Sequence, residues 1–472
     1  MHSLSNRAHL GVLLVSAVLA NGARGGEDWP RFRGKNGSGV STSRGLPADF
    51  GSGKDVRWKV ASSHGSSSPI VAGGQLYFSS FDGDQRTLHC LDAATGKVHW
   101  AQTVKRIRQE NATPPNGPAT PTPVTNGDFV FVLYPDVGVI CYTAAGVERW
   151  RIDMQPFHSM HGIASSLMTI DNLVIVLADQ LAGSYIAALK IENGQIAWKS
   201  ERADGLTGGY STPSVYHPKN GPPQLIVSGP LEVVAYDPLT GKRLWWINGV
   251  TNSPISVPVI WHDRVFVCED VGEAVPFSLM ASFDKNKDGK ISLDEVKSNV
   301  PMKRLVERID SGWGNHSGAI GAAEWDKAFG GMVNKGGLVA LDLGGSGDAT
   351  QTHVRWSYRK GMPTIPSALV YDDLVYVVKD GGILSAFEAE TGKLVKQARL
   401  KPGGHQVDAS PVAADGLIYL VDADGWLSVV KAGRDWQQVK TIELGEPCVA
   451  TPAIADGRLY VRTSKSLFCF GN

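Results

Sequence analysis

Short apolar segments alternate with short polar turns along most of the chain, and the pattern repeats at nearly constant intervals. One clear copy, at residues 91–100, reads Leu-Asp-Ala-Ala-Thr-Gly-Lys-Val-His-Trp. An apolar strand, a turn with Asp and Gly, and a strand with Trp in this order predict a β-hairpin. Related copies end at Trp150, Trp198 and Trp245, so successive tryptophans are 50, 48 and 47 residues apart. This spacing is typical of a propeller blade or a solenoid unit.

A second pair of strands precedes the hairpins. It begins at a Ser or Thr close to a proline, and an apolar strand follows within about ten residues. These markers stand at residues 67–70, 121–124, 211–214, 410–412 and 451–453. Four short strands per period predict the blade of a β-propeller. The third strands are expected at residues 87–91, 138–142, 185–189, 232–236, 337–341, 382–387, 425–430 and 466–470. The sequence therefore predicts an all-β, eight-bladed propeller of four-stranded blades.

The two ends of the repeat region complement each other. Residues 56–60 have the pattern of a Trp-bearing fourth strand but lack a preceding hairpin partner, and the last repeat stops one strand short, after residues 466–470. We expect residues 56–60 to complete the last blade, because this closes the ring and leaves no open sheet edge. The Gly- and Ser-rich segment 28–53 is expected to form a strap across the ring.

The Asp-x-x-Thr-Gly-Lys-x-x-Trp turn at residues 92–100 resembles the tryptophan-docking motif of the PQQ-like propellers. That family includes the quinoprotein dehydrogenases and the outer-membrane assembly protein BamB. The resemblance implies that the Trp of one blade packs against the neighbouring blade and that the Gly lets the turn close. It implies an architecture rather than an activity. Later copies drift, since residues 390–393 keep the turn but lose the Trp, and weaker packing is expected there.

One interval, from Trp245 to Trp356, is roughly twice the others and contains an insertion at residues 274–335. Within it, residues 284–295 match an EF-hand calcium loop, with Gly289 at the sharp turn. Calcium prefers six to eight oxygen ligands. The expected ligands are Asp284, Asn286, Asp288, the Lys290 carbonyl, Ser292 through water, and Glu295 with both oxygens. The alternative is a solvated loop of Asp and Lys without an ion.

The insertion also predicts a partner for this loop. Helical segments are expected at 277–283 and 293–299 around the first loop, and at 302–309 and 322–329 around a second loop, 310–324. The second loop is poor in carboxylates, so we expect a degenerate partner that is bridged to the first through Ile291. Weak calcium binding by Asp310, Asn315 and Glu324 remains an alternative. The strand order places the EF-hand pair beside the mouth of the central channel.

The amino-terminal residues 1–23 predict a secretory signal peptide, because they combine early basic residues with an apolar run at 10–19 and small residues near the end. The run is about half the length of a membrane-spanning helix. No Cys precedes Cys90, which excludes a lipid anchor of the BamB kind. We expect a periplasmic or secreted protein whose propeller occupies residues 27–273 and 336–472.

Composition narrows the candidate partners and the cysteine chemistry. Lys and Arg number 46, as do Asp and Glu, so no net field attracts nucleic acid. Cys90, Cys141 and Cys469 stand where other repeats have Ala, which predicts buried free thiols; a disulfide of Cys90 with another Cys remains an alternative. No two Cys are adjacent, so the adjacent-Cys disulfide typical of quinoprotein alcohol dehydrogenases is missing.

The loops that enter the innermost strands carry the polar candidates for an active site, and we expect them to ring the channel mouth. They are His64, His158, His161, Tyr210, Thr364, His405 and Asp408. In a quinoprotein such positions would hold the quinone and its calcium ion, but those roles cannot be assigned here residue by residue. His158 and His161 could share a metal ion, although no carboxylate or Cys lies nearby. Hydrolase and phosphate-loop motifs are missing from the sequence.

These observations favour an exported, non-catalytic scaffold of the BamB-like type, with no catalytic residues assigned. We expect a monomer that binds calcium through the EF-hand and binds a protein partner, without PQQ as a cofactor. One alternative is a PQQ-dependent, quinoprotein-like oxidoreductase. The other is a propeller that binds glycans or the cell wall.

Overall fold

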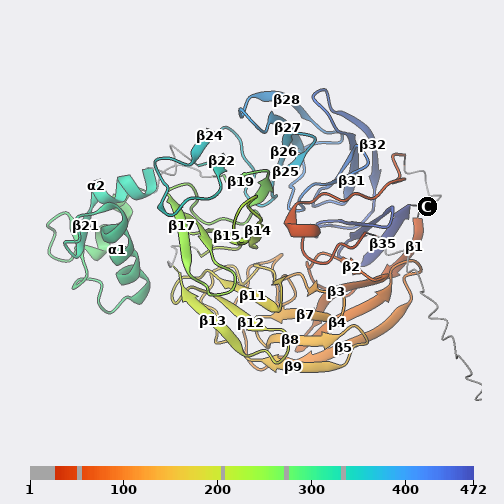
Figure 1. The fold of residues 1–472 in the computed structure, drawn as a ribbon, viewed down its shortest axis with the longest axis horizontal. Coiled ribbons are helices and arrows are strands. Elements are labelled where there is room, and N and C mark those ends of the chain that lie inside the picture. The colour runs from red at the N-terminus through yellow and green to blue at the C-terminus, as the bar shows by residue number, and fades with distance from the viewer. Residues whose placement is uncertain (1–26, 50–55, 203–207, 271–275, 331–335, 472) are drawn as a thin grey trace, which may run out of the picture.

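The computed structural model describes residues 27–49, 56–202, 208–270, 276–330 and 336–471. The predicted signal peptide lies outside these ranges. The described residues form eight blades of four antiparallel strands around a central channel, which confirms the predicted eight-bladed β-propeller (Figure 1). One blade has an additional short strand, β23 (Gly347–Asp348), which pairs parallel to the outer strand β17 (Arg243–Asn248). We number the blades 1 to 8 in chain order, and in each blade the chain runs from the innermost strand outward.

The strand bounds follow the repeat. The innermost strands are β2 (Ile70–Ala72), β6 (Val124–Thr125), β10 (Met168–Ile170), β14 (Ser214–Tyr216), β18 (Val259–Trp261), β25 (Leu369–Tyr371), β29 (Val412–Ala414) and β33 (Ala453–Ala455). The second strands are β3 (Gln75–Asp82), β7 (Phe129–Tyr134), β11 (Leu173–Ala178), β15 (Gln224–Gly229), β19 (Arg264–Cys268), β26 (Leu374–Lys379), β30 (Leu417–Val421) and β34 (Arg458–Arg462). The third strands are β4 (Gln85–Asp92), β8 (Gly138–Thr143), β12 (Tyr185–Lys190), β16 (Glu232–Tyr236), β22 (Leu338–Asp342), β27 (Ile383–Glu388), β31 (Trp426–Lys431) and β35 (Ser466–Gly471). The outer strands are β5 (Val98–Lys105), β9 (Glu148–Ile152), β13 (Ile196–Glu201), β17 (Arg243–Asn248), β24 (Val354–Tyr358), β28 (Leu394–Arg399), β32 (Gln437–Glu443) and β1 (Val56–Ala61).

Burial differs between the inner and outer strands of a blade. Every residue of β11 is buried, because both faces of this strand pack against neighbouring blades. In β13, at the rim, only Trp198 is fully buried and most other positions are exposed. The inner strand β11 is therefore a continuous apolar run, whereas the outer strand β13 is largely polar apart from Ile196, Ala197 and its Trp.

The tryptophans join neighbouring blades. The indole N–H of Trp100 donates to the Ala144 carbonyl at 3.0 Å, and that of Trp150 donates to the Ile191 carbonyl at 2.8 Å. Trp58, Trp198 and Trp356 make the same bond to the next blade. This arrangement confirms the role that the sequence resemblance implies for the motif.

A small residue stands opposite each docking Trp on the adjacent strand. Cys90 pairs with Trp100, and Cys141 pairs with Trp150. Bulk at this position would displace the indole, which explains why the repeats use Cys or Ala here. All five cysteines are free and buried, so the predicted thiols are confirmed and the alternative disulfide is not formed.

The ring closes through its two ends. β1 pairs antiparallel along β35, with Lys59 opposite Phe468 and Ala61 opposite Ser466. Blade 8 thus consists of three strands from the end of the chain and one from its beginning, in the order β1-β35-β34-β33. The closing strand that the sequence pattern predicts lies where it was expected.

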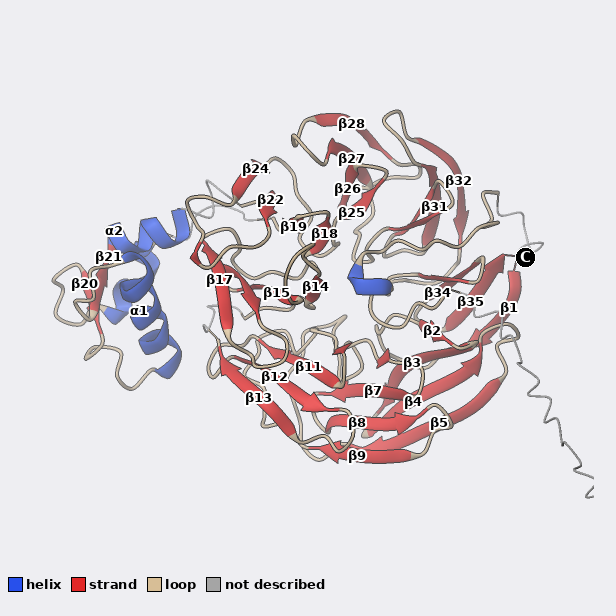
Figure 2. Ribbon diagram, viewed as in Figure 1, coloured by secondary structure: helices blue, strands red, loops and turns tan. Residues whose placement is uncertain are grey.

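The insertion between β19 and β22 is a small helical unit. It contains the 3₁₀ helix η2 (Phe277–Phe283), strand β20 (Lys290–Ser292), helix α1 (Val300–Trp313), strand β21 (Ala319–Gly321), helix α2 (Ala322–Trp325) and the π-helical turn η3 (Asp326–Gly330). We call residues 276–330 the helical insertion. Figure 2 shows that, apart from the short η1 (Lys35–Gly37) in the middle of the ring, the helices of the described chain lie in this insertion.

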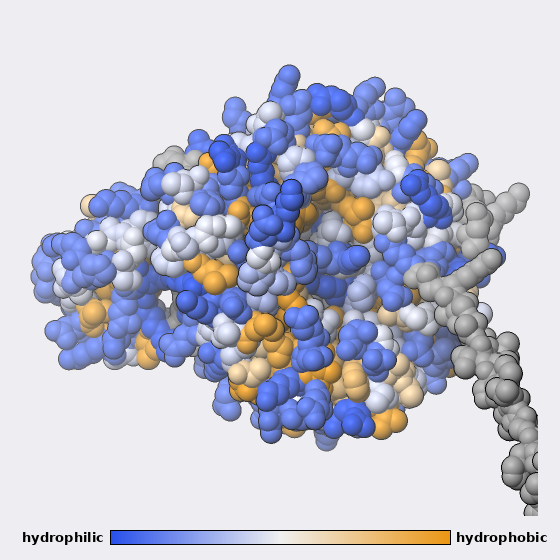
Figure 3. Space-filling view, viewed as in Figure 1, coloured by the Kyte–Doolittle hydropathy of each residue, from blue (hydrophilic) through white to orange (hydrophobic). Residues whose placement is uncertain are grey.

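Two expectations for the insertion were wrong. Residues 293–298 form turns rather than a helix, and α1 begins only at Val300, where Asn299 caps it by accepting the Met302 N–H. The insertion also lies outside the ring instead of beside the channel mouth, as a lobe with a mainly hydrophilic visible face (Figures 1 and 3). It packs on the outer part of blade 4, and strand order alone does not determine how far from the axis a long loop extends.

None of the helices in the described part of the chain combines the length and hydropathy needed to cross a membrane.

Candidate functional site

The central channel is lined by a ring of hydroxyl groups that link the blades. At one equivalent position before seven of the eight innermost strands, a backbone N–H donates to the hydroxyl of the next blade at 2.9–3.0 Å. The hydroxyls belong to Ser68, Thr122, Ser166, Thr212, Ser367, Ser410 and Thr451. Blade 5 has Val257 at this position and therefore supplies no hydroxyl. The Ser/Thr and Pro signals mark this ring in the sequence, although the sequence pattern alone predicts only their role as strand markers.

The amino-terminal strap, residues 27–49, closes one end of the channel. Its backbone bonds to blade 1 at Val71, to blade 2 at Thr125 and to blade 7 at Ala413. Two buried guanidiniums hold it: Arg31 donates to the Pro213 carbonyl at 2.6 Å and Arg33 to the Ala368 carbonyl at 2.7 Å. The predicted strap is therefore present, and its contacts with several blades fix it in place.

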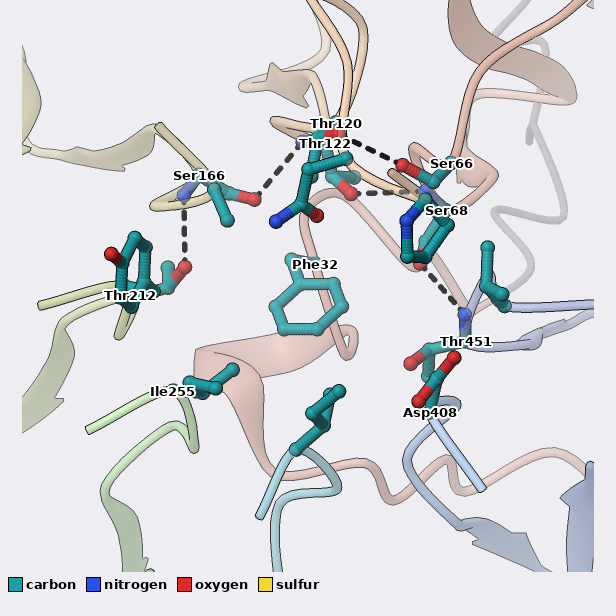
Figure 4. Close-up of a pocket in the computed structure, with 16 residues that line it drawn as sticks. Phe32, Ser66, Ser68, Thr120, Thr122, Ser166, Thr212, Ile255, Asp408 and Thr451 are labelled. Carbon is teal, nitrogen blue, oxygen red and sulfur yellow. Dashed lines mark hydrogen bonds between the residues drawn. The ribbon is translucent and has the colours of Figure 1, made fainter. Parts of the chain in front are cut away.

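Phe32, between these two arginines, forms the floor of the cavity that remains in the channel. In Figure 4 its ring points into the middle of the cavity, which is also lined by five members of the hydroxyl ring: Ser68, Thr122, Ser166, Thr212 and Thr451. The cavity has a volume of about 160 Å³. Ser66, Asn116, Tyr210, Ile255 and Asp408 are among the residues that line it. Small-molecule sites usually measure about 300–1,000 Å³, so this cavity suits water or a very small ligand.

Tyr210 and Asp408 are the two predicted mouth residues that line this cavity. Burial raises the pKa of Asp408; the bond from Gln406 acts against this, and the charge of Asp380 adds to it. Burial also raises the pKa of Tyr210. A partly desolvated carboxyl group and a neutral phenol can hold water or a small polar group by hydrogen bonds.

The other predicted mouth residues do not line the channel cavity. His64 lies in an adjoining cavity of about 240 Å³ beside Arg462, and this cavity shares Ser66, Pro115 and Val449 with the channel cavity. His161 bonds to the Thr113 hydroxyl at 3.1 Å, and His405 bonds to Asp424. The remaining two, His158 and Thr364, are exposed. The structure thus brings together only part of the predicted set. Among the residues that the structure describes, no carboxylate or thiol joins His158 and His161 to complete a metal site.

The channel cavity does not fit PQQ. PQQ is a planar quinone with several carboxylates, and it needs more room than about 160 Å³ and positive charges to receive it. Among the described residues that line the cavity, none is Lys, Arg or His, and the charged one is the acidic Asp408. Arg462, in the adjoining cavity, already donates to the carbonyls of Ser63, Ser67 and Ser79.

In the predicted calcium loop, residues 284–295, the side-chain oxygen atoms accept hydrogen bonds from backbone N–H groups of the same loop. Asp284 accepts the Gly289 N–H at 2.9 Å, and Asp288 accepts the Lys290 N–H at 2.8 Å. Gly289 has a φ of 81°, a left-handed conformation that suits glycine. Ile291, within the loop, pairs with Ile320 in the two-stranded β20–β21 sheet, which confirms the predicted bridge to a second loop.

Glu295 joins the two ends of this loop. One carboxylate oxygen accepts the N–H groups of Lys285 and Asn286 at 2.8 and 3.1 Å, and the other accepts the Ser292 N–H at 2.8 Å. These bonds, chiefly those from Ser292, lower the pKa of Glu295 to about 2, so the side chain is ionised at neutral pH. No three acidic, imidazole or thiol side chains of the described residues are gathered closely enough to hold an ion as they stand. Calcium would therefore draw Glu295 away from its backbone donors.

The second loop differs from its prediction. Asp310 belongs to α1, is buried, and accepts the Gly318 N–H at 2.7 Å, so its carboxylate holds the chain turn after the helix. Glu324 accepts the Gly321 N–H at 3.0 Å and caps α2. These two carboxylates thus support the backbone of the second loop, which is consistent with a bracing partner for the first.

The closed ring of docked blades defines the class of this protein as an eight-bladed β-propeller with a PQQ-like repeat. The chain belongs to the family described as "Outer membrane protein assembly factor BamB", whose model matches residues 47–201, 108–298 and 334–441. The matched ranges leave residues 299–333, which include α1 and α2, outside the family pattern. No curated protein gives a significant match.

Solved structures support the same fold. BamB from Moraxella catarrhalis is 12% identical, with a TM-score of 0.56 over 88% of this chain and 97% of that chain. A europium-containing methanol dehydrogenase is 11% identical, with a TM-score of 0.60 over 94% and 98%. The quinohemoprotein alcohol dehydrogenase ADHIIG from Pseudomonas putida HK5 is 12% identical, with a TM-score of 0.54 over 94% and 80%. At these identities the likeness shows the fold alone, and it includes both assembly factors and dehydrogenases.

Proposed function

We propose that this protein is an exported, non-catalytic propeller scaffold that binds calcium in its helical insertion and binds a protein partner on its surface. The size and the lining of the channel cavity support the absence of quinone-dependent catalysis. Its cavity of about 160 Å³ has Phe32 as its floor and no basic side chain among the described lining residues. A quinone cofactor therefore has neither the room nor the charge that it needs there.

Calcium would be held by Asp284, Asn286, Asp288, the Lys290 carbonyl, Ser292 through water, and Glu295. These are the oxygen ligands that calcium prefers, and Gly289 already makes the sharp turn that such a loop needs. The bound ion would act as a structural cross-link between the loop and the segment that leads to α1. Its ligands lie in the insertion, outside the ring, so it takes no part in the channel.

The sequence supports the proposal that the protein is exported, and the family description supports the proposal that it binds a protein partner. Residues 1–23 have the composition of a signal peptide, which supports a periplasmic or secreted protein. The family description names an assembly factor, which supports a protein as the partner. Equal numbers of acidic and basic residues give no electrostatic reason for nucleic acid to bind. The closed ring has paired edges at the seam, which is compatible with a monomer.

Calorimetric titration with calcium tests the insertion directly. We expect one site with a dissociation constant of roughly 10⁻⁶ to 10⁻³ M, and loss of that site in Glu295→Gln. Glu324→Gln is the matched control, because this carboxylate also accepts a backbone N–H but belongs to the second loop. Unchanged calcium binding by Glu295→Gln would contradict the assignment.

A further inference from the structure

A turn of the propeller enters the core of the helical insertion. Leu231, between β15 and β16 of blade 4, is 2% exposed and belongs to the same buried cluster as Ile291, Ile320 and Trp325 of the insertion. Its φ of 60° is left-handed, a conformation that a leucine adopts only at an energetic cost. The packing of the insertion around Leu231 is what compensates for this strained backbone.

The next residue makes an ionic link to the same insertion. The Glu232 carboxylate has a side-chain exposure of 2%, and its Oε2 accepts from Arg308 of α1 and from Arg243 of β17, each at 2.8 Å. Burial alone would raise the pKa of Glu232, but the charges of Arg308, Arg243 and Arg202 lower it overall. A buried carboxylate needs such partners, so separating α1 from blade 4 would leave Glu232 short of one.

The groups that hold this turn are continuous with the calcium loop. Ile291 lies inside the loop and is fully buried in the cluster that contains Leu231. Asn299, which caps α1 and so fixes the helix that carries Arg308, follows Glu295 by four residues. If Glu295 leaves its backbone donors to bind an ion, the backbone around Ser292, next to Ile291, has to rearrange. The segment between Glu295 and Asn299, which leads to α1, has to rearrange as well.

We propose that the turn containing Leu231 and Glu232 is an intramolecular ligand of the helical insertion, and that calcium strengthens this docking. The inference rests on the proposed calcium binding. Calcium orders β20 and the start of α1, and these elements present the apolar pocket for Leu231 and the guanidinium for Glu232. Because coupling between two binding events is reciprocal, the docked turn in return increases the affinity for calcium. The insertion then becomes a calcium-dependent clamp on blade 4.

Hydrogen exchange of the full chain, with and without calcium, tests the docking. We expect calcium to slow exchange by about 5-fold or more in two places, the segment 224–236 and helix α1, and to leave β3 and β4 of blade 1 unchanged. Slower exchange in the loop 284–295 alone would overturn the docking inference while leaving calcium binding intact. Failure of calcium to bind the wild-type chain in calorimetry would overturn both.

Two variants test the reciprocal effect. Leu231→Gly removes the side chain and suits the left-handed backbone, and Glu232→Gln removes the charge that pairs with Arg308. We expect each to weaken calcium binding about 5-fold or more. Leu239→Ala, in an exposed turn of the same blade, is the control and should bind calcium as the wild type does. Wild-type affinity in both Leu231→Gly and Glu232→Gln, with folding verified by circular dichroism, would overturn the proposal.

Discussion

At the scale of single residues, a tryptophan in one blade and a glycine in the next keep the blades in register. A Cβ on Gly194 would come within 2.7 Å of the Trp150 ring, and a Cβ on Gly241 within 2.3 Å of the Trp198 ring. These glycines also have positive φ. The motif thus needs glycine for two separate reasons, the backbone conformation and the close approach of the indole.

Alanine substitution separates the two reasons. Gly194→Ala and Gly74→Ala place a Cβ at nearly the same φ, 74° and 75°, but Gly74 has open space around it. Both should lose about 1–2 kcal/mol from the left-handed backbone, and Gly194→Ala should lose about 1–3 kcal/mol more from overpacking. Urea unfolding measures the difference. Equal losses would contradict a role for the Trp150 contact.

Residue patterns also have limits when a repeat drifts. The turn at 390–393 lacks a Trp in the following strand, and weaker packing was expected there. In the structure Lys396 takes the place of the Trp; its Nζ lies 4.9 Å from the Trp436 ring centroid and donates to the Trp436 carbonyl. The neighbouring blade thus supplies the indole that this strand has lost, an exchange that no single repeat reveals.

At the scale of elements, strand β1 carries the closure of the ring. Without it, β35 would be an open edge with unpaired N–H and C=O groups, and such an edge promotes aggregation. Lys59 also bonds to Glu446 at 3.0 Å and lies over the Phe468 ring, so the strand is held by side chains as well.

Truncation tests the closure. A chain that begins at residue 60 lacks most of β1 and should aggregate or melt at a clearly lower temperature, because the edge of β35 is exposed. A chain that begins at residue 56 lacks the strap but keeps all of β1 and is the control. Equal melting temperatures of the two chains would show that β1 does not stabilise the ring.

The elements of the insertion were harder to predict than the strands. The propeller strands repeat, so each copy supports the assignment of the others, and the predicted third strands agree with β4, β8 and β12 to within a few residues. The insertion occurs once. The segment 293–298 has helix-forming residues, and Ser292 and Glu295 exchange the hydrogen bonds of a capping box, yet the segment forms turns and the helix begins only at Val300.

At the scale of the whole molecule, the hydroxyl ring joins the blades around the channel. It has one gap, since Val257 replaces the Ser or Thr that other blades provide. In the other blades the equivalent N–H donates to a hydroxyl of the next blade. Val257→Thr would supply such a hydroxyl for the N–H of Thr212. We expect this substitution to stabilise the fold by about 1 kcal/mol.

The matched control for this prediction is Val412→Thr. Val412 is fully buried in β29 and is not part of the ring, so a new hydroxyl there has no equivalent donor. This variant should lose about 1–3 kcal/mol. Thermal and urea unfolding of both variants measure the effect. A loss of stability in Val257→Thr as large as in Val412→Thr would contradict the ring as a repeated interblade bond.

The sequence pattern does not predict contacts between segments that are far apart in the chain and occur only once. Phe32 as the channel floor, and Leu231 inside the helical insertion, depend on segments far apart in the chain. Leu231 and Trp325 are 94 residues apart, and neither belongs to a repeated pattern that links them. Local periodicity predicts elements and their neighbours, whereas the packing of unique segments depends on the assembled surface.

Titration with PQQ and calcium shows whether this propeller supports quinone chemistry. The experiment records the visible absorbance of the full chain and the reduction of an artificial electron acceptor with alcohols or sugars. We predict neither a bound quinone nor acceptor reduction, because the channel cavity of about 160 Å³ has no basic lining residue among those described. A bound chromophore together with substrate-dependent reduction of the acceptor would show that the protein is a quinoprotein oxidoreductase rather than a scaffold.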